Sequence, residues 1–241
     1  MRRIASLLFF TGLCFADTVF SGGGVFPHVA DGGGNQTAMT LVNLDDTANT
    51  YTLTLYSDGG TPLTMATSAG TGSTFSGTLQ PHASVTITTA GVSLTVAQGW
   101  GQIKTMGTIG GSALFRISIP PWIGSEAMVP ADTNLSNRFA FVYDNSAGIA
   151  NGVALVNPFS FESITVFVAF RDENGGEFAL DSFVLGPLNH FTFVVTQRYP
   201  STIGHRGTFE ISTTGPWMNA LGLRFGTSAI STILPLVSIL W

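Results

Sequence analysis

Residues 50–60 read TYTLTLYSDGG, so threonines alternate with aliphatic and aromatic residues until the run ends at two glycines. Alternation with a period of two places one set of side chains on each face of a β-strand. An Asp-Gly pair at the end of such a run is typical of a hairpin turn. Residues 84–88, SVTIT, alternate in the same way, and no segment shows the period of an amphipathic helix. The pattern predicts half-buried strands joined by tight turns.

The chain contains the same unit twice. Residues 26–31 (FPHVAD) correspond to 139–144 (FAFVYD), and the Leu-Val-Asn that ends at Asn43 recurs at Asn157. Further correspondences join 53–60 to 167–176, 79–81 to 185–187, 101–103 to 207–209, and 113–116 to 220–224. We therefore predict an all-β fold of two tandem β-sandwich repeats, Ig-like or jelly-roll-like, each with about eight short strands. The predicted bounds are 17–131 for the first repeat, 132–137 for a linker and 138–241 for the second repeat.

The first sixteen residues resemble a secretory signal peptide. Arg2 and Arg3 precede an apolar run, and Ala16 ends a short segment like a cleavage site. The sequence thus predicts a bacterial protein that is exported and either secreted or held at the cell surface. Cleavage would remove Cys14, the only cysteine, which leaves the mature chain without disulfides, thiolate metal sites or a cysteine nucleophile.

Charge limits the partners that the chain can have. Without the signal, seven basic residues face 14 acidic ones, and only one of the basic residues is a lysine. Nucleic acid is excluded because no basic stripe can neutralise phosphates. No run of 18 apolar residues follows the signal, so we expect no transmembrane helix. Charged residues make up 10% of the chain, and such sparse charge favours association with further copies.

The repeat landmarks resemble an uncharacterised tandem β-sandwich repeat of predicted secreted bacterial proteins. The residues that carry this resemblance are 26–34 (FPHVADGGG), 41–43 (LVN), 171–175 (RDENG), 205–208 (HRGT) and 221–225 (LGLRF). The resemblance covers nearly the whole mature chain. It implies a secreted β-rich module and brings no activity, cofactor or catalytic residue with it.

The chain lacks the patterns of common catalytic and metal sites. The histidines at 28, 82, 190 and 205 do not have the spacing of metal ligands, and no G-x-S-x-G motif is present. The glycines of residues 31–35, DGGGN, do not lead into a helix as a phosphate loop would. We predict no metal site, no cofactor and no enzymatic activity. A hydrolase remains as an alternative, and its candidate carboxylates are Asp31, Asp58, Glu126, Asp144 and Asp172.

Two further sets of residues are candidates for a functional or structural role. Aromatic rings exposed on one surface can stack on sugars, and the candidates are Trp100, Trp122, Tyr143 and Trp217. Trp100 lies between glycines and Trp217 follows a proline, so packing in the core or anchoring of a loop is the favoured alternative for these rings. Polar residues that recur in both repeats suggest a shared structural skeleton, in the pairs Asp31 and Asp144, Asn43 and Asn157, Asp58 and Asp172, and Arg116 and Arg224. We expect each of the two arginines to be held by hydrogen bonds within its own repeat.

These observations favour one function and leave another open. The predicted function is that of a secreted, non-enzymatic structural or adhesive surface protein that assembles with copies of itself or with another component of the cell surface. The alternative is a carbohydrate-binding module that holds a polysaccharide through the four aromatic residues.

Overall fold

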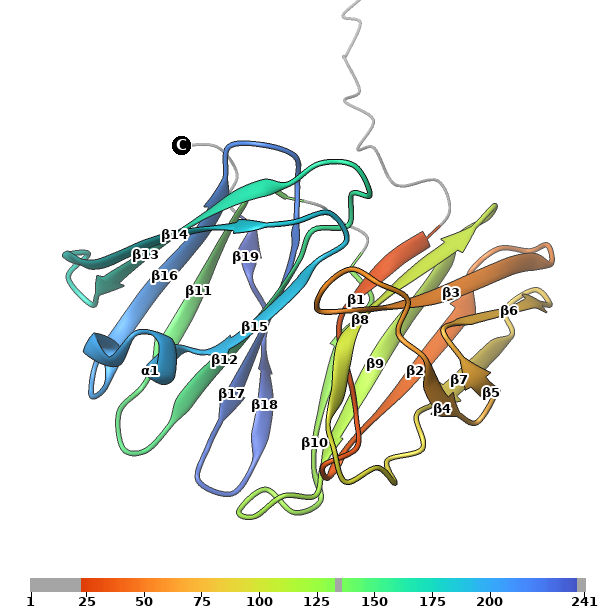
Figure 1. The fold of residues 1–241 in the computed structure, drawn as a ribbon, viewed down its shortest axis with the longest axis horizontal. Coiled ribbons are helices and arrows are strands. Elements are labelled where there is room, and N and C mark those ends of the chain that lie inside the picture. Colours follow the sequence, from red (N-terminus) through yellow and green to blue (C-terminus); the bar gives the residue numbers. More distant parts are fainter. Residues whose placement is uncertain (1–22, 133–135, 238–241) are drawn as a thin grey trace, which may run out of the picture.

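The alternating run at residues 50–56 lies within a strand. In the computed structural model, which describes residues 23–132 and 136–237, β3 (Asn49–Ser57) buries Tyr51, Leu53 and Leu55, while the threonines between them face outward. Most of the described chain forms strands, and Figure 1 shows a molecule made almost entirely of them. The predicted all-β fold is confirmed.

The first half of the chain forms two sheets that pack face to face. Its strands are β1 (Gly23–Asp31), β2 (Asn35–Asn43), β3, β4 (Met65–Thr67), β5 (Gly70–Gly72), β6 (Thr74–Leu79), β7 (Ser84–Thr88), β8 (Ala97–Thr105), β9 (Ile109–Ile117) and β10 (Ser125–Pro130). One sheet has the order β1-β8-β3-β6 and the other β10-β9-β2-β7, while β4 and β5 form a separate hairpin. All strand pairs in the two sheets are antiparallel.

The second half repeats this arrangement. Its elements are β11 (Arg138–Asp144), β12 (Ala150–Val156), β13 (Ile164–Asp172), β14 (Glu177–Leu185), β15 (His190–Val194), α1 (Val195–Arg198), η1 (Pro200–Thr202), β16 (Arg206–Thr213), β17 (Asn219–Phe225), β18 (Ile230–Ile233) and β19 (Leu236–Val237). The sheets have the orders β14-β13-β16-β11-β19 and β15-β12-β17-β18. Read in chain order, eight strands of each half occupy the same places in the two sandwiches.

Each sandwich buries its own core between its two sheets. The core of the first is built around Phe26, Met39 and Leu53, and the core of the second around Phe141, Phe170 and Phe209. Ala154 and Leu221 lie in strands of the second sandwich but belong to the core cluster of the first. The outer face of the sheet β15-β12-β17-β18 therefore packs against the first sandwich, and the two units stand side by side in Figure 1.

Several predicted features fall partly or wholly outside the described residues. These are the signal peptide at 1–16 and residues 133–135 of the predicted linker. Strand β10 ends at Pro130 and β11 begins at Arg138. No helix within the described part of the chain is long and apolar enough to cross a membrane.

Candidate functional site at the junction of the two sandwiches

A bulge in β1 sends His28 toward the second sandwich. Phe26 pairs with Gly101 of β8 and Val29 pairs with Gly99, so β1 contains one residue more than β8 over this stretch. An extra residue of this kind redirects a side chain that would otherwise follow the pleat of the sheet. His28 consequently points across the junction, where its ring lies 5.3 Å from the ring of His190.

His28, His190 and Asp58 form a chain of polar contacts across the junction. Nδ1 of His28 lies 3.3 Å from Nε2 of His190, and Nδ1 of His190 lies 2.7 Å from Oδ1 of Asp58. The side chain of His190 is fully buried, and its backbone N–H also donates to the carbonyl oxygen of Asp58. His28 and Asp58 belong to the first sandwich and His190 to the second, so this chain, which we call the junction relay, joins the two units.

The hydrogen-bonding capacities of the three groups fix the direction of the relay. An ionised Asp58 only accepts, so Nδ1 of His190 donates to it. Nε2 of a neutral His190 is then an acceptor, and Nδ1 of His28 donates to it. This arrangement leaves Nε2 of His28 as a hydrogen-bond acceptor.

Electrostatics lower the basicity of two of the three relay groups, His28 and Asp58. The pKa of His28 is lowered from 6.5 to about 3, mainly by burial and to a smaller extent by the neighbouring His190. Burial raises the pKa of Asp58, but hydrogen bonds from His190 and Gln98 outweigh it, so the pKa of this carboxyl lies below its usual value. General base catalysis is most effective when the pKa of the base is near the working pH. His28 and Asp58 are therefore poor proton acceptors near pH 7, and their contacts with His190 join the two sandwiches.

Other contacts hold the same junction. The indole N–H of Trp100 in β8 donates to the carbonyl oxygen of Leu188 at 2.7 Å, and Tyr56 stacks on the Trp100 ring. The indole N–H of Trp122 donates to the carbonyl oxygen of Gly226 at 2.6 Å. Both tryptophans thus connect the first sandwich to loops of the second, Trp100 to the loop between β14 and β15 and Trp122 to the loop between β17 and β18.

A cleft of about 310 Å³ opens beside the relay. Residues of both sandwiches line it, namely His28, Gln98, Gly152, Val153, Ala154, Thr192, Phe193, Val194, Gln197, Leu221, Leu223 and Phe225. Four lining residues are polar, which we call the polar wall, and the other eight are apolar, which we call the apolar wall; the polar ones are His28, Gln98, Thr192 and Gln197. Within the described residues, no group of three or more His, Cys, Asp or Glu side chains could hold a metal ion.

A second candidate surface lies on the outward face of the sheet β14-β13-β16-β11-β19. A groove of about 470 Å³ crosses β13, β14 and β16, lined by Phe167, Val168, Ala169, Leu180, Asp181, Ser182, Glu210 and Ser212. Leu180 and Val184 on β14 are 70% and 68% exposed, and Phe167 is 40% exposed. Apolar side chains that gather on one surface in this way mark an interaction site more often than scattered ones do.

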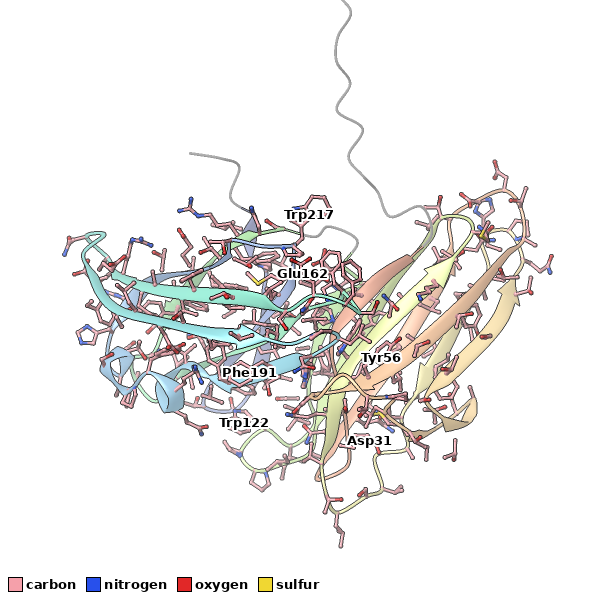
Figure 2. The ribbon with its side chains drawn as sticks, turned by 45° about the horizontal axis from the view of Figure 1, so that its top comes forward. Asp31, Tyr56, Trp122, Glu162, Phe191 and Trp217 are labelled. Carbon is pink, nitrogen blue, oxygen red and sulfur yellow. The ribbon has the colours of Figure 1, made fainter. Side chains whose placement is uncertain are left out.

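The structure separates the four aromatic residues that the sequence nominated for sugar binding. Trp100 and Tyr143 are buried, so neither offers a ring face to solvent. Trp122 is half-buried against Phe225, and Trp217 is 44% exposed. In Figure 2, Trp122 and Trp217 lie well apart. The four rings do not form one platform.

Asn43 and Asn157 occupy equivalent places and do the same work. Nδ2 of Asn157 lies 2.7 to 3.2 Å from the carbonyl oxygens of Glu162, Leu185 and Gly186. Nδ2 of Asn43 contacts the carbonyl oxygens of Thr47, Leu79 and Gln80 over the same range of distances. Both side chains are fully buried. Each asparagine ties the end of one strand to the turn that follows the edge strand of the opposite sheet.

The strand register shows that the other three recurring residue pairs are not structurally equivalent. Ser57 pairs with Gly99 in the first sandwich and Asp172 pairs with Gly207 in the second, so Asp172 is equivalent to Ser57 and not to Asp58. By the same comparison Asn145 is equivalent to Asp31, and Phe225 to Arg116. Equivalence in a sheet is defined by ladder register and not by residue identity. The two residues of each of these three pairs are of the same type but do not occupy the same structural position in the two sandwiches.

The shifted residues have separate local roles. Asp31 accepts from the N–H of Gly91, Asp144 accepts from Ser146, and Asp172 accepts from the N–H groups of its own turn. Arg116 pairs with Glu126 of its own repeat at 2.7 Å. Arg224 lies across the ladder from Asn151, and no hydrogen bond of its side chain is found in the described part of the chain.

The sequence matches no protein-family model and no curated protein.

Proposed function

We propose that this protein is an exported, non-enzymatic structural or adhesive component of the cell surface that associates with further copies of itself through β14. The observation that carries this proposal is the contrast between the edge strands β6 and β14, which occupy equivalent positions in the two sandwiches. An edge strand presents unpaired backbone N–H and C=O groups that another chain can pair with.

The edge strand of the first sandwich is protected. β6 has six residues, includes a glycine, and exposes Thr74, Ser76 and Thr78. A short strand with hydroxyl side chains offers little apolar surface to a partner. Chain association at this edge would therefore gain few contacts beyond the backbone.

The edge strand of the second sandwich lacks this protection. β14 has nine residues, contains no proline or lysine, and exposes Leu180 and Val184 on its outward face. Its inward Asp181 is bound by Arg198 at 2.7 Å and by the Tyr199 hydroxyl at 2.8 Å, so this charge is already neutralised. Backbone groups and apolar side chains are thus available at the same edge.

A second copy fits this edge by symmetry. Antiparallel pairing of two β14 strands about Ser182 would place Leu180 of one copy opposite Val184 of the other, and the reverse. Cross-strand apolar pairs of this kind stabilise a sheet by roughly 0.2–1 kcal/mol each. The register about Ser182 also avoids placing Asp181 opposite its own copy, because Asp181 then faces Phe183. The two five-stranded sheets would become one continuous sheet.

Val184→Lys is expected to weaken self-association at least about tenfold, because the lysine charge would be carried into the paired edge twice per dimer. Thr78→Lys is the matched control, since Thr78 holds the equivalent position on β6 and should leave association unchanged. The measurement is molar mass by light scattering during size exclusion of the purified chain from Asp17 onward, over a wide concentration range. A monomer at every concentration, or equal weakening by both variants, would contradict the proposal.

One observation favours a second candidate function on the same sheet. The groove over β13 and β14 combines the exposed ring of Phe167 with hydroxyls of Ser182 and Ser212 and the carboxylate of Glu210. A ring beside hydrogen-bonding groups is a common arrangement for holding a sugar. We expect retention on an insoluble polysaccharide, if it occurs, to be lost in Phe167→Ala and kept in Trp217→Ala. Failure of the folded protein to bind any member of a broad glycan panel would remove this candidate.

A further inference from the structure

We infer that the cleft between the two sandwiches binds a small uncharged molecule that carries a hydroxyl group next to an apolar ring. This site is distinct from the β14 edge, and the inference does not depend on the proposed self-association. It rests on three properties of the cleft, which are its apolar wall, its polar wall and the absence of charged side chains among its lining residues.

The apolar wall is shaped by a glycine. Val194, Leu223 and Phe225 line the cleft, and Gly152 of β12 pairs with both Val194 and Leu223. A Cβ atom on Gly152 would lie 2.7 Å from Cε2 of Phe225, so the ring of Phe225 can approach the strand only because residue 152 is a glycine. A lining that contains a phenyl ring and two aliphatic side chains suits an apolar group of a ligand.

The polar wall offers both kinds of hydrogen-bonding group. Nε2 of Gln98 donates to Oδ2 of Asp58 at 2.8 Å and lies 3.2 Å from Oγ1 of Thr192. These contacts fix the Gln98 amide and leave its Oε1 as an acceptor, while the Thr192 hydroxyl keeps its hydrogen to donate. A ligand hydroxyl can donate to the first and accept from the second. The two residues belong to different sandwiches, so the ligand would bridge the junction.

Charge and size narrow the class of ligand. The lining includes no Asp, Glu, Lys or Arg, and the low pKa of His28 keeps that ring neutral at pH 7. A charged ligand would lose its hydration without gaining a partner, and an anion would also be repelled by Asp58 behind Gln98. A volume of about 310 Å³ lies at the small end of the range of ligand pockets, roughly 300–1,000 Å³. The site therefore fits a molecule with one ring and one hydroxyl group.

Phenethyl alcohol is the probe, with phenylacetate and ethylbenzene as charged and apolar comparators. Saturation-transfer NMR and titration of the purified wild-type chain should give a dissociation constant on the order of 1 mM for phenethyl alcohol, which is what so few atoms can supply. Phenylacetate should bind at least about tenfold more weakly, since its carboxylate would be buried without a partner. No binding of phenethyl alcohol, or equal binding of phenylacetate, would overturn the inference.

Two variants locate the binding. Gln98→Met removes the polar acceptor while keeping the side-chain volume, and it should weaken phenethyl alcohol about fivefold to tenfold. Gln102→Met is the control, because Gln102 lies on the same strand and the same face but outside the cleft. Val194→Phe should fill the apolar wall and abolish binding, with thermal unfolding used to confirm that each variant is folded. Binding that survives both Gln98→Met and Val194→Phe would place the probe elsewhere and refute the site.

Discussion

Asn157→Asp is expected to lower the free energy of unfolding by about 3 to 5 kcal/mol, because it replaces a buried donor by a charged acceptor. Nδ2 of Asn157 faces the carbonyl oxygens of Glu162, Leu185 and Gly186, and the side chain is fully buried. An aspartate of the same shape would point a negative oxygen at all three. Asn43→Asp should have an effect of the same size in the first sandwich, since its surroundings are equivalent.

Urea unfolding followed by circular dichroism measures this effect. Asn174→Asp is the control: Asn174 lies exposed in the turn after β13, where only its backbone N–H is used, so a change below about 0.5 kcal/mol is expected. Asn157→Ala should fall between the two variants, because it leaves the carbonyls without a donor but adds no charge. Stability of Asn157→Asp within about 1 kcal/mol of the wild type would show that the amide contacts do not support the fold.

Local patterns in the sequence were enough to predict the strands and the repeated unit. Alternation at Tyr51, Leu53 and Leu55 identified which side chains enter the core, because the period of a strand is a property of neighbouring residues. The Leu-Val-Asn of each repeat identified Asn43 and Asn157, whose equivalence the sheet pairing supports. Such features depend on a few consecutive residues and on one strand end.

Register and long-range contacts were not readable in the same way. Matching the two repeats by residue identity made Gly101 equivalent to Gly207. In the strand ladders the residue equivalent to Gly207 is Gly99, since Gly99 lies opposite Ser57 at the end of β3 and Gly207 lies opposite Asp172 at the end of β13. A Cβ atom on either Gly99 or Gly207 would come within about 2 Å of a carbonyl oxygen on the neighbouring strand, which is the physical reason that both are glycines. That constraint appears only when the partner strand is known.

The candidate sites also depend on long-range contacts, so the sequence did not predict them. His28 and His190 are 162 positions apart and lie in different repeats, so no spacing rule could join them. Trp100 was nominated for a surface, but the second sandwich covers it. Likewise, the apolar face of β14 is notable only because β14 lies at the edge of its sheet. Each of these facts is set by how sheets and repeats pack, which local composition does not encode.

The stability of the protein is expected to fall as the pH falls from 6.5 to 4, and His28 should account for about 3 kcal/mol of the loss. The pKa of His28 is about 3 in the folded chain, against 6.5 for an ordinary histidine. Between these values the unfolded chain binds a proton that the folded chain does not, so acid favours unfolding. The contribution is absent above pH 6.5 and grows by up to about 1.4 kcal/mol per pH unit below it.

The carboxyl groups act in a different window. The pKa values of Asp58 and Asp181 are lowered in the folded protein, since hydrogen bonds from His190 and Gln98 to Asp58, and from Tyr199 and Arg198 to Asp181, outweigh the opposing effect of burial. Groups with lowered carboxyl pKa values lose their stabilising effect only as the pH falls below the ordinary value of 3.8. A loss of stability between pH 6.5 and 4.5 therefore reports on histidine and not on these carboxylates.

His28→Gln isolates the contribution of His28. Glutamine supplies an N–H for Nε2 of His190 but takes up no proton, so the variant should lose much of the slope of unfolding free energy against pH between 6.5 and 4.5. His205→Gln is the control, because His205 is exposed and its ring lies beside Phe178 of β14, outside the relay. Urea unfolding at half-unit steps of pH gives the slopes, and an equal slope in wild type and His28→Gln would show that the ring is not held neutral at the junction. A reduced slope in His28→Gln alone would show that the His28 ring is kept neutral in the folded protein by burial and by the neighbouring His190.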